Sequence, residues 1–233
     1  MIKIEHIHTC NWEAAIRSMR NPLNSWVKSD SYWEKIDEVG CACVRGDDYP
    51  HACMYDYVYI LGPNDHKLAL QLATAGSDHG KFLRSIIFSC DITAPMYWWK
   101  EMDTYKIGTV RNSCSTMHKI MSKEFEPDDF SHDKMLWDGV ESLDATIGYL
   151  NGLRERYLKV RPCEEKEGMK SIWYTLIQSL PSSYNQRATW TANYEVLRNI
   201  YHARKNHKLD EWHEFCDMIE QLPYSELITE VRK

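Results

Sequence analysis

The stretch that decides the fold is residues 84–103, RSIIFSCDITAPMYWWKEMD. From Ile86 to Ile92 every second residue is apolar, and Ile87 adds an apolar side chain to the opposite face. This pattern is typical of a central strand with most of both faces covered. Pro95 then opens an aromatic helix, because proline is well tolerated in a first helical turn.

Upstream of this stretch, strands alternate with short helices. The sequence predicts a strand over residues 2–7, a helix over 12–19 and a strand over 55–61, from apolar periodicity and turn residues. A further helix follows over 62–75, with proline near its beginning and glycine after its end. Ser77 is placed to cap another short helix.

Downstream, the pattern changes to helices. Residues 136–160 carry apolar side chains at steps of three and four, which predicts one long amphipathic helix. Three more helices are expected over 165–180, 187–205 and 209–222. Strands therefore come first and a large helical half follows, which defines an α+β fold. No repeat or Gly/Ser linker divides the chain, so residues 1–233 are predicted to form a single domain.

Composition excludes several classes of protein. The 233 residues carry a formal net charge of -6, which argues against binding a nucleic-acid polymer along its phosphates. No apolar run approaches the roughly 20 residues that span a bilayer, and the first residues lack a signal-peptide core. We expect a folded cytoplasmic protein with no membrane contact.

The eight cysteines are scattered and are expected to be reduced thiols. A local cluster of Cys41, Cys43, His51 and Cys53 has enough ligands for zinc, although neither pair has the spacing of a common zinc knuckle. The alternative is a strand and turn with small, half-buried thiols. The prediction is that no metal is bound.

A first candidate site lies in the predicted 187–205 helix. Asn193 and Arg204 are 11 residues apart, close to three helical turns, so both are expected on one face. They form either two structural contacts or two walls of a pocket. Arginine is a natural clamp for phosphate, and His207 just beyond could join it.

A second candidate is the segment 112–118, which contains Asn112 and Ser115 and is rich in hydroxyl, amide and thiol groups. Such groups supply hydrogen bonds to a small ligand, and Lys106 and Arg111 would favour an anion. An ordinary surface loop has the same composition.

Two further features have alternative interpretations. His79 precedes the central strand and could bind a cofactor or transfer a proton, although a lone histidine is more often structural. Trp98 and Trp99 could stack on a flat ring, although an aromatic pair in a helix is more often part of the core.

Together these elements resemble the flavin-dependent thymidylate synthase family. In that family a histidine precedes a strand, an Ala-Pro step opens a helix, and a signature Arg-His-Arg is followed by seven residues, Ser, any residue and Arg. His79, Pro95 and Ser115 resemble these elements in order, and the interval from Asn193 to Arg204 resembles a later Asn and Arg.

The resemblance covers about residues 78–120 and 181–215, and it departs from the family at the signature itself. Arg-His-Arg falls on Thr-Tyr-Lys at 104–106 or, with one insertion, on Tyr-Lys-Ile at 105–107. Met117 replaces the arginine after the signature serine, and its side chain has no hydrogen-bond donor for phosphate.

The resemblance implies a homotetramer that binds FAD, takes hydride from NADPH and moves a one-carbon unit from methylenetetrahydrofolate onto dUMP. The cofactor-binding residues predicted for this chain are His79, Lys106 and Asn193. The predicted nucleotide-binding residues are Asn112, Ser115, Arg204 and His207. Two alternatives remain beside catalysis: a non-catalytic protein that sequesters or senses a nucleotide, and a scaffold or assembly protein.

Overall fold

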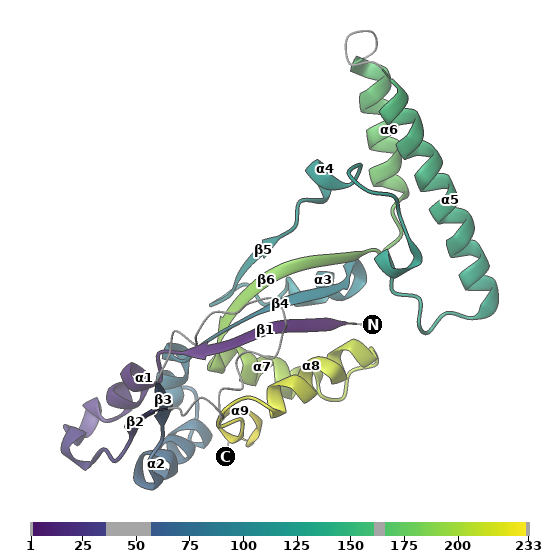
Figure 1. Cartoon of the computed structure of the whole chain (residues 1–233). Coiled ribbons are helices and arrows are strands. Elements are labelled where there is room, and N and C mark those ends of the chain that lie inside the picture. Colours follow the sequence, from purple (N-terminus) through teal and green to yellow (C-terminus); the bar gives the residue numbers. More distant parts are fainter. Residues whose placement is uncertain (1, 36–56, 161–165, 232–233) are drawn as a thin grey trace. The chain divides into compact units, whose positions relative to one another are not determined.

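The computed structural model of the chain describes residues 2–35, 57–160 and 166–231. The Cys41, Cys43, His51 and Cys53 cluster lies outside the described residues. The fold mixes helices with a small sheet, so the α+β prediction is confirmed (Figure 1). The chain divides into two compact units: unit 1 comprises 1–8, 89–191 and 206–215, and unit 2 comprises 9–88, 192–205 and 216–233. The single-domain assignment stays a prediction.

A four-stranded sheet has the order β1-β4-β6-β5 (Figure 1). Its strands are β1 (Lys3–Cys10), β4 (Ile87–Pro95), β5 (Val110–Ser113) and β6 (Asn185–Asn193). The strand β4 is interior, and its alternating residues Phe88, Cys90, Ile92 and Ala94 are buried. The predicted central strand is therefore confirmed, although it begins at Ile87 rather than at the predicted Arg84 and runs three residues beyond Ile92.

A second, two-stranded sheet joins β2 (Tyr32–Lys35) antiparallel to β3 (Tyr57–Ile60). The helix α1 (Trp12–Met19) has the predicted bounds, and α2 (Pro63–Thr74) ends one residue earlier than predicted. Just before α2, a Cβ on Gly62 would lie 2.3 Å from the carboxyl carbon of Asp30. Only glycine allows this approach without displacing Asp30.

Short elements complete the described chain. The helices are α3 (Met96–Met102), α4 (Thr116–Lys119), α8 (Asp210–Glu220) and α9 (Glu226–Thr229). The 3-10 helices are η1 (Asn21–Leu23), η2 (Trp26–Lys28), η3 (Gly80–Ser85) and η4 (Pro127–Asp129). The short helix predicted after Ser77 is the 3-10 helix η3, whose first residue lies three positions further on.

The helix predicted over residues 187–205 is wrong in its first half. Residues 185–193 form the strand β6, in which Ala188, Trp190 and Ala192 are buried in alternation. The strand β6 pairs antiparallel with β5, and this long-range pairing outweighs the local helical pattern.

The helix α7 (Tyr194–Arg204) begins only after β6 ends. The Asn193 side-chain oxygen accepts a hydrogen bond from the backbone N–H of Val196 at 3.1 Å, so Asn193 is the helix N-cap. The prediction that Asn193 and Arg204 project from one face of a single helix is wrong, because Asn193 has extended backbone geometry.

Two long helices lie side by side in unit 1, α5 (Trp137–Lys159) and α6 (Lys166–Ser179) (Figure 1). Both agree with the predicted helices within a few residues. Their shared core consists of Ile120, Phe125, Phe130, Leu143, Ile147, Leu150, Leu153 and Leu176.

A second core in unit 1 is built from indole rings. Trp98 packs against Trp99 at 5.1 Å and against Trp212 at 4.8 Å between ring centroids, and Phe215 joins them. All three tryptophans are fully buried. The core interpretation of Trp98 and Trp99 is therefore confirmed.

Candidate functional site

The segment of residues 113–117 runs from the last residue of β5 into the first turn of α4 and borders two hollows in unit 1. We call it the β5–α4 loop. The larger hollow has a volume of about 470 Å³ and the smaller about 180 Å³. Residues that line both hollows are Cys114, Ser115, Thr116, Tyr184 and Gln186.

Two of the walls of the larger hollow are α3 and the chain that follows α6. The backbone N–H groups of Met96 and Tyr97, in the first turn of α3, donate to the carbonyl oxygens of Tyr184 and Ser182 at 3.0 and 3.1 Å. These bonds hold the two walls together. The apolar residues that line the larger hollow are Met96, Met117, Ile177, Leu180 and Pro181. Its further polar lining residues are Lys100, Ser113 and Ser182.

Gln186, on β6, fixes the β5–α4 loop. Its side-chain nitrogen donates to the Cys114 carbonyl oxygen at 3.1 Å and to the Thr116 hydroxyl at 3.2 Å. The Ser115 hydroxyl accepts from the backbone N–H of His118 at 3.3 Å and caps α4. The loop is thus held at both ends by side-chain hydrogen bonds.

The cation at the larger hollow is Lys100, which is exposed and forms no ion pair within the described ranges. Arg111 is not available to a ligand, because it lies 2.6 Å from the Asp103 carboxylate and 3.8 Å from the centroid of the Trp99 ring. Arg111 also donates to the side-chain oxygen of Gln186. The sequence predicted that Arg111 would favour an anion, but in the structure its side chain makes contacts that stabilise the fold.

Sequence reasoning missed Lys100. The available signal was its spacing of four residues from Met96 in the predicted helix that begins after Pro95, which places both side chains on one face. That face lines the hollow.

Tyr184 adds a neutral polar group to both hollows. Burial, followed by the negative charge of Asp129, raises the pKa of the Tyr184 phenol. The hydroxyl therefore stays protonated at neutral pH and can donate a hydrogen bond.

The predicted site residues of unit 1 have different surroundings. Ser115 lines both hollows. Lys106 is exposed in the turn after α3, and Asn112 is exposed on β5 opposite Thr189. His207 accepts a hydrogen bond from the Leu209 N–H at its Nδ1.

This hydrogen bond also identifies the ring nitrogen of His207 that carries the proton. Its Nδ1 is the acceptor, at 3.2 Å from the Leu209 nitrogen, so Nε2 carries the proton in the neutral ring. Nε2 lies 3.3 Å from the Glu101 carboxylate, and the ring packs edge-on against Trp212. These contacts place His207 in a structural network.

The other predicted residues lie in unit 2. His79 is exposed directly before η3, Asn193 caps α7, and Arg204 is the half-buried last residue of α7. The larger hollow therefore brings Ser115 together with Lys100, and the remaining predicted site residues are not among those that line it.

Two absences hold for the described part of the chain. It contains no group of three or more His, Cys, Asp or Glu side chains arranged to hold a metal ion. No helix in it is long and apolar enough to cross a membrane.

The fold is that of the flavin-dependent thymidylate synthases. A crystal structure of the Helicobacter pylori enzyme ThyX, complexed with FAD and dUMP, matches with a TM-score of 0.63 at 15% sequence identity, over 99% of this chain and 100% of that chain. A second ThyX structure from Helicobacter pylori with FAD and dUMP, at 2.31 Å resolution, matches with a TM-score of 0.62 at 15% identity, over 99% and 98% of the two chains. No family model and no curated protein matches the sequence.

Proposed function

We propose that the chain binds a nucleotide in the larger hollow beside the β5–α4 loop. The observation that carries the proposal is the position of the Lys100 ammonium at a concave surface that also carries hydroxyl donors and apolar walls. A nucleotide needs this combination, a cation and donors for phosphate and an apolar surface for the base.

The groups divide by chemistry. Lys100 supplies the positive charge, and the hydroxyls of Ser113, Ser115 and Thr116 supply hydrogen bonds to phosphate or sugar oxygens. Met117 and the other apolar lining residues contact the base. The volume of about 470 Å³ falls within the range of about 300 to 1,000 Å³ typical of small-molecule sites.

The comparisons support dUMP as the first nucleotide to test, since both ThyX structures hold dUMP. We propose dUMP, or a closely related pyrimidine nucleotide, as the ligand. Binding alone would make the chain a nucleotide-sequestering or nucleotide-sensing protein.

Reductive methylation of dUMP with FAD, NADPH and methylenetetrahydrofolate is the second candidate function, supported by the FAD in the same ThyX structures. Within unit 1 the residue predicted for flavin is Lys106, and a single exposed lysine is too little to hold a diphosphate. Lys106 lies in unit 1, His79 lies in unit 2, and the Asn193 amide oxygen already accepts from Val196.

The pocket assignment is tested by calorimetric titration of dUMP into wild-type protein and a Lys100→Glu variant. We expect the variant to bind at least about tenfold more weakly, because a like charge then faces the phosphate. The matched control is Lys67→Glu, which changes an exposed lysine of α2 in the same way and should bind like wild type. Equal affinity of Lys100→Glu and wild type would refute the assignment.

A footprint on Cys114 gives independent evidence. This exposed thiol lines both hollows, so bound dUMP should slow its alkylation, measured by peptide mass spectrometry. The half-buried Cys10 in β1 is the internal reference and should react at an unchanged rate. If no nucleotide binds and Cys114 is never protected, the scaffold function becomes the better account.

Flavin is tested separately by denaturing the purified protein and identifying whatever it releases by absorbance and mass spectrometry. Released FAD, or stoichiometric uptake of added FAD, would support the enzyme function and justify a dUMP methylation assay. A protein that releases a nucleotide without flavin, and refuses added FAD, would support sequestration or sensing.

We also propose that the chain works as a homo-oligomer, a tetramer by the resemblance to its structural neighbours' family. Its mass in solution, measured by light scattering after size exclusion, tests this directly. A monomer at every accessible concentration would contradict it.

A further inference from the structure

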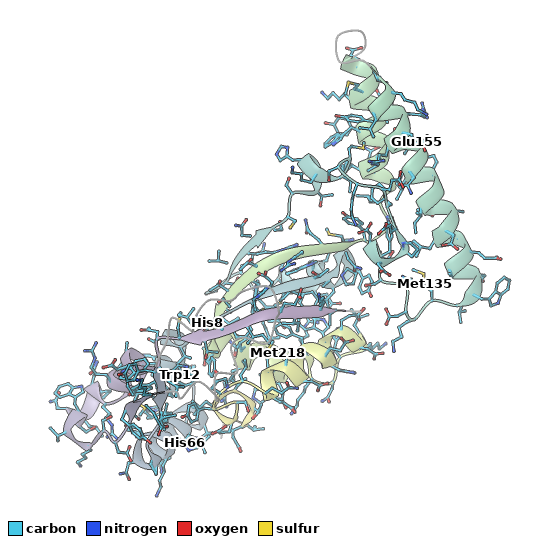
Figure 2. All side chains as sticks on the ribbon, in the orientation of Figure 1. His8, Trp12, His66, Met135, Glu155 and Met218 are labelled. Atoms are coloured by element: carbon cyan, nitrogen blue, oxygen red, sulfur yellow. The ribbon has the colours of Figure 1, made fainter. Side chains whose placement is uncertain are left out.

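The helix α5 has one covered face and one open face. Its buried side chains, including Leu143, Ile147 and Leu150, pack in the core shared with α6. On the opposite side, Glu141 and Gly148 are exposed, and Figure 2, which labels Glu155 on this helix, shows side chains of α5 that project away from α6. We infer that this open face pairs antiparallel with the same face of a second copy of the chain.

The charges on the open face are arranged to match themselves in reverse. Asp138 and Glu141 lie near the start of α5, and Arg156 and Lys159 lie near its end. A two-fold axis between residues 148 and 149 opposes position i to position 297 − i. Asp138 then faces Lys159, and Glu141 faces Arg156.

A parallel arrangement would instead place each charged residue opposite the same residue of the second copy, and such like-charge pairs are destabilising. In the antiparallel arrangement each ion pair occurs twice, because the interface is isologous. Neither Glu141 nor Arg156 forms an ion pair inside the described chain, while Lys159 lies 3.3 Å from Glu155 of its own helix. Glu141 and Arg156 are therefore the residues that remain available to pair with a second copy.

The backbone at the centre of this face is bare. Gly148 and Gly152 lie one turn apart, and a Cβ on either would meet nothing within 4 Å. Nothing in the described chain therefore requires glycine there, although glycine weakens a helix relative to alanine. The proposed axis opposes Ala145 to Gly152, so the smallest side chains meet where the two helices would approach most closely.

An exposed aromatic ring extends the same face. Trp137 exposes 76% of its surface and precedes Gly148 by 11 residues, close to three full turns. Met135 and Leu136, directly before it, are exposed as well, and contiguous exposed apolar patches are typical of interaction surfaces. A second copy, with the reversed charges of Arg156 and Lys159 near this end, matches the face better than an unrelated helix.

The inference deepens the proposed self-association by naming one of its faces. The test compares wild-type protein with Glu141→Arg and Arg156→Glu in sedimentation experiments over a concentration series. Each single variant should lose this interface, raising the dissociation constant at least tenfold. The double variant Glu141→Arg/Arg156→Glu should recover it, and so should a mixture of the two single variants, because both cross-pairs then have opposite charges.

Asp217→Arg is the matched control, because it makes the same charge change at an exposed position of α8 and should associate like wild type. A bulky Gly148→Leu variant should dissociate while keeping its helical circular dichroism. If the wild type is oligomeric and the single variants assemble normally, this face is wrong while self-association stands. A wild type that is monomeric would overturn both the α5 face and self-association. Both would also be overturned if the wild type stays monomeric and its α5 binds a different protein.

Discussion

The Asp65 carboxylate in α2 is fully buried in unit 2 and is surrounded by donors. Arg20 donates to one oxygen at 2.5 Å, and the hydroxyls of Ser29 and Ser31 donate to the other at 2.6 and 2.7 Å. The backbone N–H groups of Asp30 and Ser31 add two bonds at 3.1 Å. Burial raises the pKa of Asp65, but the hydrogen bonds from the serines and Arg20 outweigh it and leave the pKa below its usual range.

The variant Asp65→Asn should therefore lose about 3 kcal/mol of unfolding free energy at pH 7, because the buried Arg20 charge is left without its partner. The pH dependence has a definite sign. The depressed pKa stabilises the folded state above the unfolded value of about 3.9, and this contribution is lost as the pH falls below it. Urea denaturation between pH 3 and 7 measures both, and the variant should show a smaller loss on acidification. An unchanged midpoint at pH 7 would contradict this account.

The cysteines of unit 1 should differ strongly in reactivity. Burial, together with the charge of Asp91, raises the pKa of the Cys90 thiol to about 12, so it stays protonated and enclosed at pH 8. Cys114 is exposed. Alkylation of the native protein should modify Cys114 at least about tenfold faster than Cys90, as measured peptide by peptide. Comparable rates would show that β4 is open to reagent.

At the scale of elements, the start of α7 depends on one side chain. Replacing Asn193 by alanine should cost about 1 kcal/mol of stability, because the N–H of Val196 loses its acceptor. Asn193→Asp keeps an acceptor there and should retain most of the stability. Thermal unfolding of the three proteins measures the difference, and equal stability of Asn193→Ala and wild type would argue against the cap.

The same region shows where sequence reasoning stops. The helix α1 and the long helix α5 follow from periodicity within one segment. The strand β6 does not, since its pairing of Thr191 with Val110 joins residues far apart in sequence. Local composition also identified the β5–α4 loop and Ser115 as polar and accessible. It did not show that Arg111 pairs with Asp103 and packs on the Trp99 ring, because such contacts exist only after folding.

At the scale of the whole molecule, the pairing proposed for α5 makes association depend on salt. At physiological ionic strength, the attraction between charges at a solvent-accessible interface decays over a Debye length of about 8 Å, and this length shortens as salt is added. The dissociation constant of the assembly should therefore rise several-fold between low and high salt, in sedimentation experiments. The double variant Glu141→Arg/Arg156→Glu should show the same dependence. Association that strengthens with salt would indicate an apolar interface elsewhere.

The two hydrogen bonds from Gln186 to the β5–α4 loop also bear on the kinetics of binding. A loop that is already ordered loses little conformational entropy when a ligand arrives. Nucleotide entry into the larger hollow would then be a single diffusional encounter, with an observed rate that rises linearly with ligand concentration in stopped-flow experiments. A rate that reached a plateau would mean that the loop must open first, and the opening would then set the speed at which the protein responds to its nucleotide.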